Sequence, residues 1–114
     1  MKQVLLIRKD LGMRRGKEIA QGAHASMKAT LENMEDPRVI EWLAGSFAKI
    51  ALVVNSEEEL LSLYEDAKAK GMVSALITDN GRTEFGGIPT NTVVAIGPDE
   101  PEAIDAITGH LKLR

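Results

Sequence analysis

Apolar residues gather in four short runs along the chain, and each run predicts a β-strand. The first, Val4–Ile7, is continuous and rich in branched side chains, which is typical of a central or parallel strand buried on both faces. The other three runs are Phe47–Val54, Val73–Thr78 and Thr92–Ile96. Lys49 interrupts the second run, so we expect it near the start of its strand or at a sheet edge.

Small and apolar residues recur at helical spacing between the first two runs. A long first helix should stop at Asp36-Pro37, because proline interrupts helical hydrogen bonding. Its expected apolar face contains Ala20, Ala23, Met27, Leu31 and Met34. A shorter helix is predicted from Pro37 to Gly45, with apolar residues at Val39, Ile40, Trp42 and Leu43.

Two more helices are predicted in the second half of the chain. Ser56 and Glu59 form a capping box, in which a hydroxyl and a carboxylate satisfy free N–H groups at a helix start, and Gly71 is a typical helix end. The segment Pro98–Pro101 introduces a last short helix that ends near Gly109. The residues of this helix expected to be buried are Ala103, Ile104 and Ile107.

This alternation of strands and helices predicts an α/β fold. Right-handed crossovers should make the first and second strands parallel to their successors, while the fourth strand can lie antiparallel beside the third. We therefore expect a mixed four-stranded sheet with helices on both faces, a three-layer α/β/α sandwich. At 114 residues, one domain spanning residues 1–114 is the simplest organisation.

Composition narrows the chemistry that the chain can perform. With no cysteine, disulfides, Cys-based zinc sites and thiol nucleophiles are excluded, and two histidines cannot supply a multi-histidine metal site. No apolar stretch approaches the roughly 20 residues of a membrane span, and the apolar run at the start is too short for a signal peptide. We expect a cytoplasmic protein without a membrane partner.

The net charge of −3 argues against a general nucleic-acid binder, so no DNA partner is expected. The average conceals clustering, however. Five cations lie near the N-terminus, namely Arg8, Lys9, Arg14, Arg15 and Lys17, while acidic residues concentrate at Glu57–Glu59 and Asp99–Asp105. Such a polarised surface can bind an anion on one side only.

Two polar segments follow predicted strands and should meet at one edge of the sheet. They are Gly12–Lys17 after the first strand and Asp79–Thr83 after the third, and ligands of α/β sheets bind at the carboxyl ends of parallel strands. The loop Asp79–Asn91 is long and rich in glycine, which suggests function, and it includes Arg82 and Glu84. A carboxylate, an ammonium and hydroxyls gathered there can position water and offset developing negative charge.

The first long helix carries a polar stripe made of Lys17, Gln21, His24 and Lys28. Cations at a helix start are mildly unfavourable, which points to an anion site. Structural interpretations remain open for each feature. Exposed cations can point into water, His24 can be a structural hydrogen-bonding residue, and Asp79-Asn80 can form an Asx turn.

The same segments carry a resemblance to a known family. Residues 16–25 read Gly-Lys-Glu-Ile-Ala-Gln-Gly-Ala-His-Ala and resemble the Gly-Lys-x-x-Ala-Gln-x-x-His-Ala signature of the peptidyl-tRNA hydrolase 2 family. Asp79-x-Gly81-x-Thr83-Glu84 is similar to its second motif. Thr92–Pro98 and Ile107–Leu113 are similar to the family's fourth strand and its usual ending, so the likeness spans nearly the whole chain.

The resemblance implies a usually dimeric α/β/α enzyme that hydrolyses the ester between peptide and tRNA without a metal or other cofactor. The catalytic positions that it implies are Lys17, Asp79, Thr83 and Thr92. Asp79 would orient or deprotonate water, Lys17 would stabilise the oxyanion or a terminal phosphate, and the threonines would hold the water and Asp79. The residues expected to bind the substrate or its tRNA are Arg14, Arg15, Gln21, His24 and Arg82.

This sequence departs from the family's pattern in the loop between the last two strands. Asn80 replaces a small residue, and the segment Phe85–Asn91 is slightly longer than usual, which leaves Thr90 as an alternative to Thr92. Two other functions stay open: a non-catalytic RNA- or nucleotide-binding module on the same fold, and a dimer that acts only through interactions. A close approach of Asp79 to Lys17 would favour the hydrolase.

Overall fold

The computed structural model describes residues 1–114, and its strands form one sheet in the order β2-β1-β4-β3. The strands are β1 (Lys2–Arg8), β2 (Ala48–Val54), β3 (Ser74–Asp79) and β4 (Thr90–Asp99). β1 pairs parallel with β2, and β4 pairs antiparallel with both β1 and β3. β1, β2 and β3 therefore run in one direction, as predicted, although β2 and β3 lie at opposite edges of the sheet.

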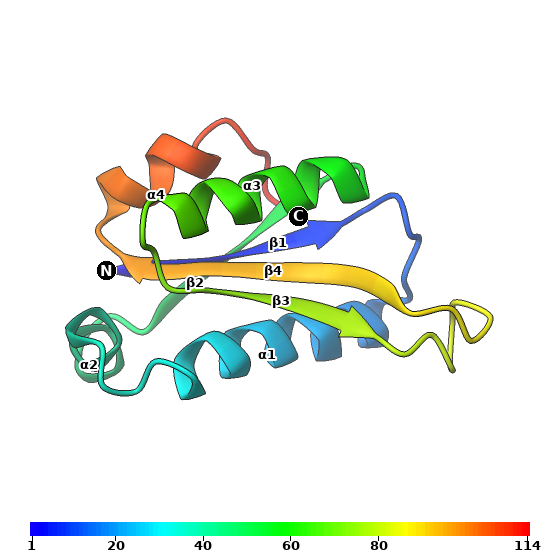
Figure 1. Ribbon diagram of the computed structural model, residues 1–114, viewed down its shortest axis with the longest axis horizontal. Helices are drawn as coiled ribbons and strands as arrows, with labels where there is room; N and C mark the ends of the chain where they lie inside the picture. The colour runs from blue at the N-terminus through cyan, green and yellow to red at the C-terminus, as the bar shows by residue number, and fades with distance from the viewer.

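Helices cover both faces of the sheet (Figure 1). The helices are α1 (Arg15–Leu31), α2 (Pro37–Ala44), α3 (Glu57–Ala69) and α4 (Pro101–Thr108). α1 and α2 lie on one side of the sheet and α3 and α4 on the other, so the α/β/α sandwich with a mixed four-stranded sheet is confirmed. None of the helices has the length and apolar character needed to cross a membrane.

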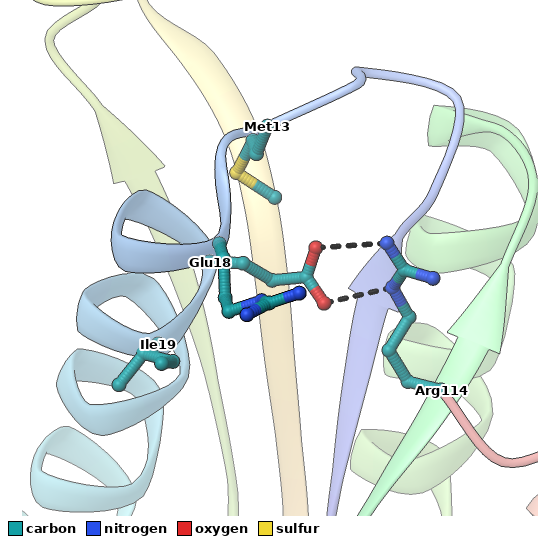
Figure 2. A pocket seen from close by; sticks show the side chains of 5 residues that line it. Met13, Glu18, Ile19 and Arg114 are labelled. Atoms are coloured by element: carbon teal, nitrogen blue, oxygen red, sulfur yellow. Dashed lines mark hydrogen bonds and ion pairs between the residues drawn. The ribbon is translucent and has the colours of Figure 1, made fainter.

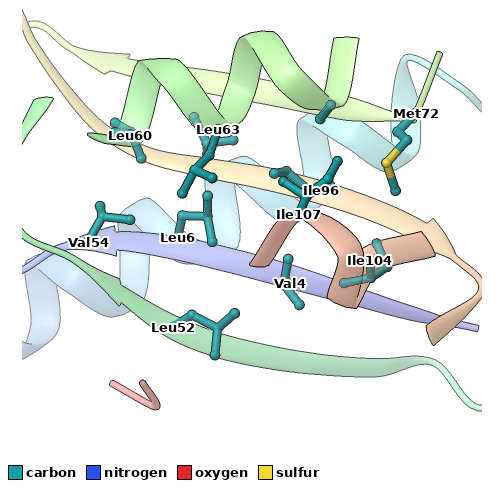
Figure 3. Close-up of a cluster of buried hydrophobic side chains, with 12 residues drawn as sticks. Val4, Leu6, Leu52, Val54, Leu60, Leu63, Met72, Ile96, Ile104 and Ile107 are labelled. Atoms are coloured by element: carbon teal, nitrogen blue, oxygen red, sulfur yellow. The ribbon is translucent and has the colours of Figure 1, made fainter. Parts of the chain in front are cut away.

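Successive side chains of β1 point to opposite faces of the sheet, so β1 contributes to two hydrophobic clusters, one on each face. Val4 and Leu6 point into the cluster beneath α3 and α4, where Leu60 and Ile104 complete the packing (Figure 3). Ile7 points to the opposite cluster under α1 and α2. β1 is thus buried on both faces, which explains its continuous apolar run.

Helix α1 packs on the sheet with a different face from the predicted one. Its buried residues are Gln21, Gly22, Ala25 and Ala29. The expected apolar face stays exposed instead, with exposed fractions of 57% for Met27, 59% for Leu31 and 48% for Met34. Ile19, which was not part of the predicted face, is 67% exposed. We call Ile19, Ala23, Met27 and Leu31 the apolar stripe. The prediction was wrong because small residues let the helix lie close to the sheet while Gln21 satisfies its amide there.

The loop between β3 and β4 is shorter than predicted. β4 begins at Thr90 because Thr90 pairs with Asp79 across the ladder, and the Thr78 hydroxyl donates to the amide oxygen of Asn91 at 2.6 Å. Polar residues at a strand end can extend a ladder when their side chains bond to each other. Phe47 also lies outside β2, because its backbone has a φ of 52°.

The capping box of α3 is confirmed with one difference. The Ser56 hydroxyl accepts a hydrogen bond from the Glu59 amide at 3.0 Å, and the Glu59 carboxylate accepts one from the Asn55 amide at 2.8 Å. The carboxylate thus reaches one residue before the cap. Lys49 lies near the start of β2, which is an edge strand, so both predicted placements hold.

Candidate active site

Three predicted side chains meet where the first turn of α1 faces the end of β3. The Lys17 ammonium donates to Asp79 Oδ1 and to Thr83 Oγ1, both at 2.9 Å. The side chains of Lys17 and Asp79 are only 15% and 12% exposed. The expected approach of the two segments at one sheet edge is therefore present.

Asp79 is held at both carboxylate oxygens. Oδ1 accepts from Lys17 and, more distantly at 3.4 Å, from Gln21 Nε2, while Oδ2 accepts from the Gly81 amide at 2.9 Å. The bond to Gly81 is an Asx turn, so the structural interpretation of Asp79 is confirmed, and it leaves Oδ1 to contact Lys17. The hydrogen bond from Lys17 lowers the pKa of Asp79, with smaller contributions from Gly81 and the charge of His24.

Glycine is required at position 81 by the path of the loop. Its φ is +81°, and a Cβ there would lie 2.1 Å from the backbone oxygen of Ile88. The Gly81 carbonyl accepts hydrogen bonds from the amides of Phe85 and Gly87, which closes the loop on itself. This closure holds Thr83 over Lys17, whose ammonium lies 5.8 Å from the centre of the Phe85 ring.

Gln21 and Thr92 form a buried pair behind Asp79. The Thr92 hydroxyl donates to Gln21 Oε1 at 2.5 Å, and both residues are buried. Because Oε1 accepts that hydrogen bond, the Gln21 amide nitrogen turns toward Asp79. Thr92 therefore reaches Asp79 through Gln21. Thr90 pairs with Asp79 through the backbone ladder, and its hydroxyl donates to the Ile88 carbonyl.

The predicted cations differ in their surroundings. Arg14 is 91% exposed, and its backbone amide donates to Glu84 at 3.3 Å at the start of α1. Arg15 and Arg82 are also exposed. Arg8 belongs to the fold instead, because its guanidinium binds Asp10 and the Asn91 carbonyl. The Arg14 Nε lies 4.0 Å from a carboxylate oxygen of Glu84, so Arg15 and Arg82 are the exposed arginines here without an ion pair.

The whole chain matches the profile of the family described as "Peptidyl-tRNA hydrolase PTH2" over residues 1–114. The chain belongs to this family. The predicted family and the predicted enzyme class are thereby confirmed. The match covers all of the motif residues that the structure brings together.

Individual proteins agree with the family match. The peptidyl-tRNA hydrolase of Methanocaldococcus jannaschii is 47% identical, and the alignment covers 99% of each chain. The enzyme of that name from Methanothermobacter thermautotrophicus is 41% identical over 99% of each chain. The probable peptidyl-tRNA hydrolase 2 of Dictyostelium discoideum is 48% identical, and the alignment spans 54% of that longer protein.

A separate pocket of about 420 Å³ lies on the other flank of α1 and does not include Lys17 or Asp79. Met13, Arg15 and Ile19 line it together with Glu18 and Arg114, whose charged groups point toward each other in Figure 2. Arg114 Nε donates to Glu18 at 2.7 Å. In this hydrolase the ion pair attaches the last residues of the chain to the first turn of the helix that carries Lys17.

From the sequence, Gln21 is expected on the polar stripe as a residue that binds the substrate, whereas in the structure it is buried between Asp79 and Thr92. One signal was available, because glutamine and histidine are unusual choices for a purely solvated face. The backbone amide of Gly81 was also missed as a partner of Asp79, although the Asx turn expected at this position provides that bond. His24 lies exposed one turn beyond Gln21.

Proposed function

We propose that this chain hydrolyses the ester between peptide and tRNA in peptidyl-tRNA and so returns free tRNA. The observation that carries the proposal is the contact of the Lys17 ammonium with both Asp79 and Thr83 at one accessible edge. Ester hydrolysis needs an oriented water and compensation of the negative charge on the carbonyl oxygen. The three side chains offer both functions within one turn of a helix and one loop.

Each side chain has a distinct proposed role. A lowered pKa makes Asp79 a weak base, so it orients the attacking water and accepts its proton only as the new bond to the carbonyl carbon forms. Lys17 offsets the charge of the oxyanion. The Thr83 oxygen accepts a hydrogen bond from Lys17, which leaves its own proton free to donate to the oxyanion or to the departing tRNA oxygen. Thr92 keeps Asp79 in place through Gln21.

The exposed arginines Arg14, Arg15 and Arg82 are proposed to bind the phosphates of the tRNA acceptor end. Arg14 and Arg15 lie at the start of α1 and Arg82 lies in the loop after β3, and these two segments meet at Lys17. Arg15 also lines the pocket on the other flank of α1. His24 lies further along the polar stripe and can contact the substrate beside Gln21. Binding by a few local cations reconciles a net charge of −3 with an RNA substrate.

We also propose that the chain works in the cytoplasm as one domain and as a homodimer. The apolar stripe of α1 supports the dimer, because Met27 and Leu31 are more than half exposed and α2 adds exposed Ile40 and Leu43. Contiguous apolar surface of this kind marks contact sites between proteins. No DNA partner is proposed, since the net charge of the chain is −3.

The proposal is tested by incubating the purified protein with N-acetylaminoacyl-tRNA and measuring the release of free tRNA. We expect hydrolysis by the wild type and a loss of about 10²- to 10⁴-fold in kcat/KM for Lys17→Met and for Asp79→Asn. Lys28→Met is the matched control, because Lys28 is an exposed lysine of the same polar stripe. Full activity of both site variants would refute these roles.

A further inference from the structure

The outer side of β3 has no partner strand. β3 is the last strand of the sheet, and the amide of Gly97 donates to the carbonyl of Val73 at 2.7 Å just before β3 begins. Hydrogen-bonded pairs alternate in an antiparallel ladder, so Ala75 and Ile77 direct their backbone groups to β4. Ser74 and Leu76 therefore direct their N–H and C=O groups away from the sheet.

The opposite edge of the sheet is protected. The amide of Val53 donates to the carbonyl of Lys112 at 2.9 Å, and the amide of Arg114 donates to the carbonyl of Ala51 at 3.0 Å. Leu113 forms an isolated antiparallel bridge with Leu52. β2 also carries Lys49, and an inserted lysine is a common protection of edge strands. β3 reads Ser-Ala-Leu-Ile-Thr-Asp and has neither a lysine nor a proline. An open edge of this composition is expected where pairing with another chain is useful.

The open edge leads directly into the candidate active site. Asp79, which contacts Lys17, is the last residue of β3. A peptidyl-tRNA carries its ester on the C-terminal residue of the peptide, so that residue must lie beside Asp79. The rest of the peptide then extends either along β3 or away from the protein.

Polar side chains of α1 accompany β3 along its length. The polar stripe of α1 begins at Asp79 with Lys17 and Gln21 and continues with His24 and Lys28, both of them exposed. α1 runs opposite to β3, since it leads back from the end of β1, so the stripe follows the strand away from the site. Thr78 is exposed next to Asp79.

We propose that the peptide of the substrate binds as an added strand, parallel to β3, with its ester at Asp79. The direction follows from the chemistry, because β3 runs toward Asp79 and the peptide must end there. Backbone groups would carry the recognition, which suits an enzyme that receives peptides of any sequence. The inference rests on the proposed function, since it takes the peptidyl ester as the ligand.

The length of β3 limits how many residues of the peptide can pair with it. Leu76 lies three residues and Ser74 five residues before Asp79, which corresponds to about 10 Å and about 17 Å along a strand. Residues of the peptide beyond about the fifth from the ester would pass the end of β3. The affinity for substrate should therefore rise with peptide length and then level off.

The first test varies the substrate of the wild-type protein. We expect kcat/KM for N-acetylated peptidyl-tRNAs to rise roughly tenfold from one residue to about five and then stay constant, as a gain of one or two net hydrogen bonds would give. N-methylation of single peptide bonds should remove the gain at alternate residues only, because a strand bonds to its neighbour with a period of two. An equal effect at all positions, or none, would overturn the proposal.

The second test varies the protein. Leu76→Pro removes an outward N–H and leaves the ladder to β4, and proline is tolerated on an edge strand. Leu76→Ala is the matched control, because it also shortens the side chain but keeps the N–H. We expect the ratio of kcat/KM for the five-residue substrate to that for the one-residue substrate to fall close to one in Leu76→Pro and to stay near tenfold in Leu76→Ala.

The outcomes separate this inference from the function on which it rests. No cleavage of the one-residue substrate by the wild type would contradict the hydrolase itself. Cleavage without dependence on length would overturn only the added strand. A fall to monomeric mass in Leu76→Pro, with the length dependence retained, would assign the edge to self-association and also overturn the proposal. If Leu76→Pro does not fold, the N-methylated substrates decide.

Discussion

Helix α1 carries two stripes that differ from those of an ordinary amphipathic helix, because the polar stripe is buried at one end and the apolar stripe is exposed. The polar stripe faces the sheet at its start, where Gln21 is buried and Lys17 contacts Asp79. The apolar stripe faces outward, with Met27 and Leu31 more than half exposed. A helix that packs only for stability buries its apolar side. Small residues at Gly22, Ala25 and Ala29 let this side of α1 approach the sheet, and this packing brings Lys17 and Gln21 to the end of β3.

Apart from the loss of Lys17 or Asp79 themselves, the largest effect should come from replacing the buried residue of the polar stripe. Gln21→Leu removes the amide that links Asp79 to Thr92, and we expect kcat/KM to fall about 10²-fold because Asp79 loses its fixed orientation. Thr92→Val should cost about tenfold, and Thr92→Ser should restore activity, since only the hydroxyl is needed. The loss should lie in kcat, measured by hydrolysis of N-acetylaminoacyl-tRNA.

Ser26→Ala is the matched control for this effect. Ser26 also lies on α1, and its hydroxyl donates to the buried Gln3 at 2.6 Å, away from Asp79. Both changes should lower the free energy of unfolding by about 1–3 kcal/mol, because each leaves a buried polar partner unpaired. Only Gln21→Leu should lower kcat. Equal losses of activity in the two variants would mean that Gln21 acts through stability alone.

The fold was predictable where residue pattern and burial agree. The continuous run in β1 and the capping box of α3 each indicate one local structure, and crossover handedness then fixes three strand directions. The packing face of α1 was not predictable in this way. Apolar periodicity shows which side of a helix avoids water, but Ile19 and Met27 meet solvent here because this surface has no partner within the chain.

The candidate site was predictable from topology for Lys17 and Asp79, since the ends of parallel strands meet at one edge. The position of Thr83 depends on how the loop closes on Gly81, which local sequence does not determine. The burial of Gln21, which the sequence predicted as a substrate-binding residue, was not predictable because it depends on the small residues Gly22 and Ala25 beside it. The link from Thr92 to Asp79 depends on that burial.

The apolar stripe offers the next test of the comparison. Leu31→Glu places a charge in the proposed dimer contact, and we expect the dimer dissociation constant to rise roughly 30-fold, which corresponds to about 2 kcal/mol. Lys28→Glu is the control, because it changes charge on the polar stripe of the same helix. Sedimentation measures the association. A wild-type protein that is monomeric at all concentrations would contradict the proposed homodimer.

A smaller effect concerns the cations around the polar stripe. Arg14→Ala and Arg82→Ala should each reduce the dependence of tRNA binding on salt by about one unit of slope, because each removes one phosphate contact. KM should rise severalfold while kcat stays nearly unchanged. Lys70→Ala is the control, since Lys70 is exposed at the end of α3, far from this edge. An identical slope in all variants would exclude these arginines from the tRNA contact.

The smallest effect on activity is expected from a change of pH between about 5 and 8. The pH dependence tests whether Lys17, at the buried end of the polar stripe, lowers the pKa of Asp79. The hydrogen bond from Lys17 lowers the pKa of Asp79 in the folded protein below its ordinary value near 4. A carboxyl with a depressed folded pKa stabilises the fold above its unfolded pKa, and this contribution is lost as pH falls through the folded value. Between about pH 5 and 8, Asp79 stays charged, so its protonation should not limit kcat/KM.

In Lys17→Met the carboxyl resonance of Asp79, followed by NMR, should titrate at higher pH than in the wild type. Lys28→Met, which alters the exposed end of the same stripe, should leave that titration in place. Equal titrations in the wild type and Lys17→Met would show that Lys17, at the buried end of the polar stripe, does not lower the pKa of Asp79.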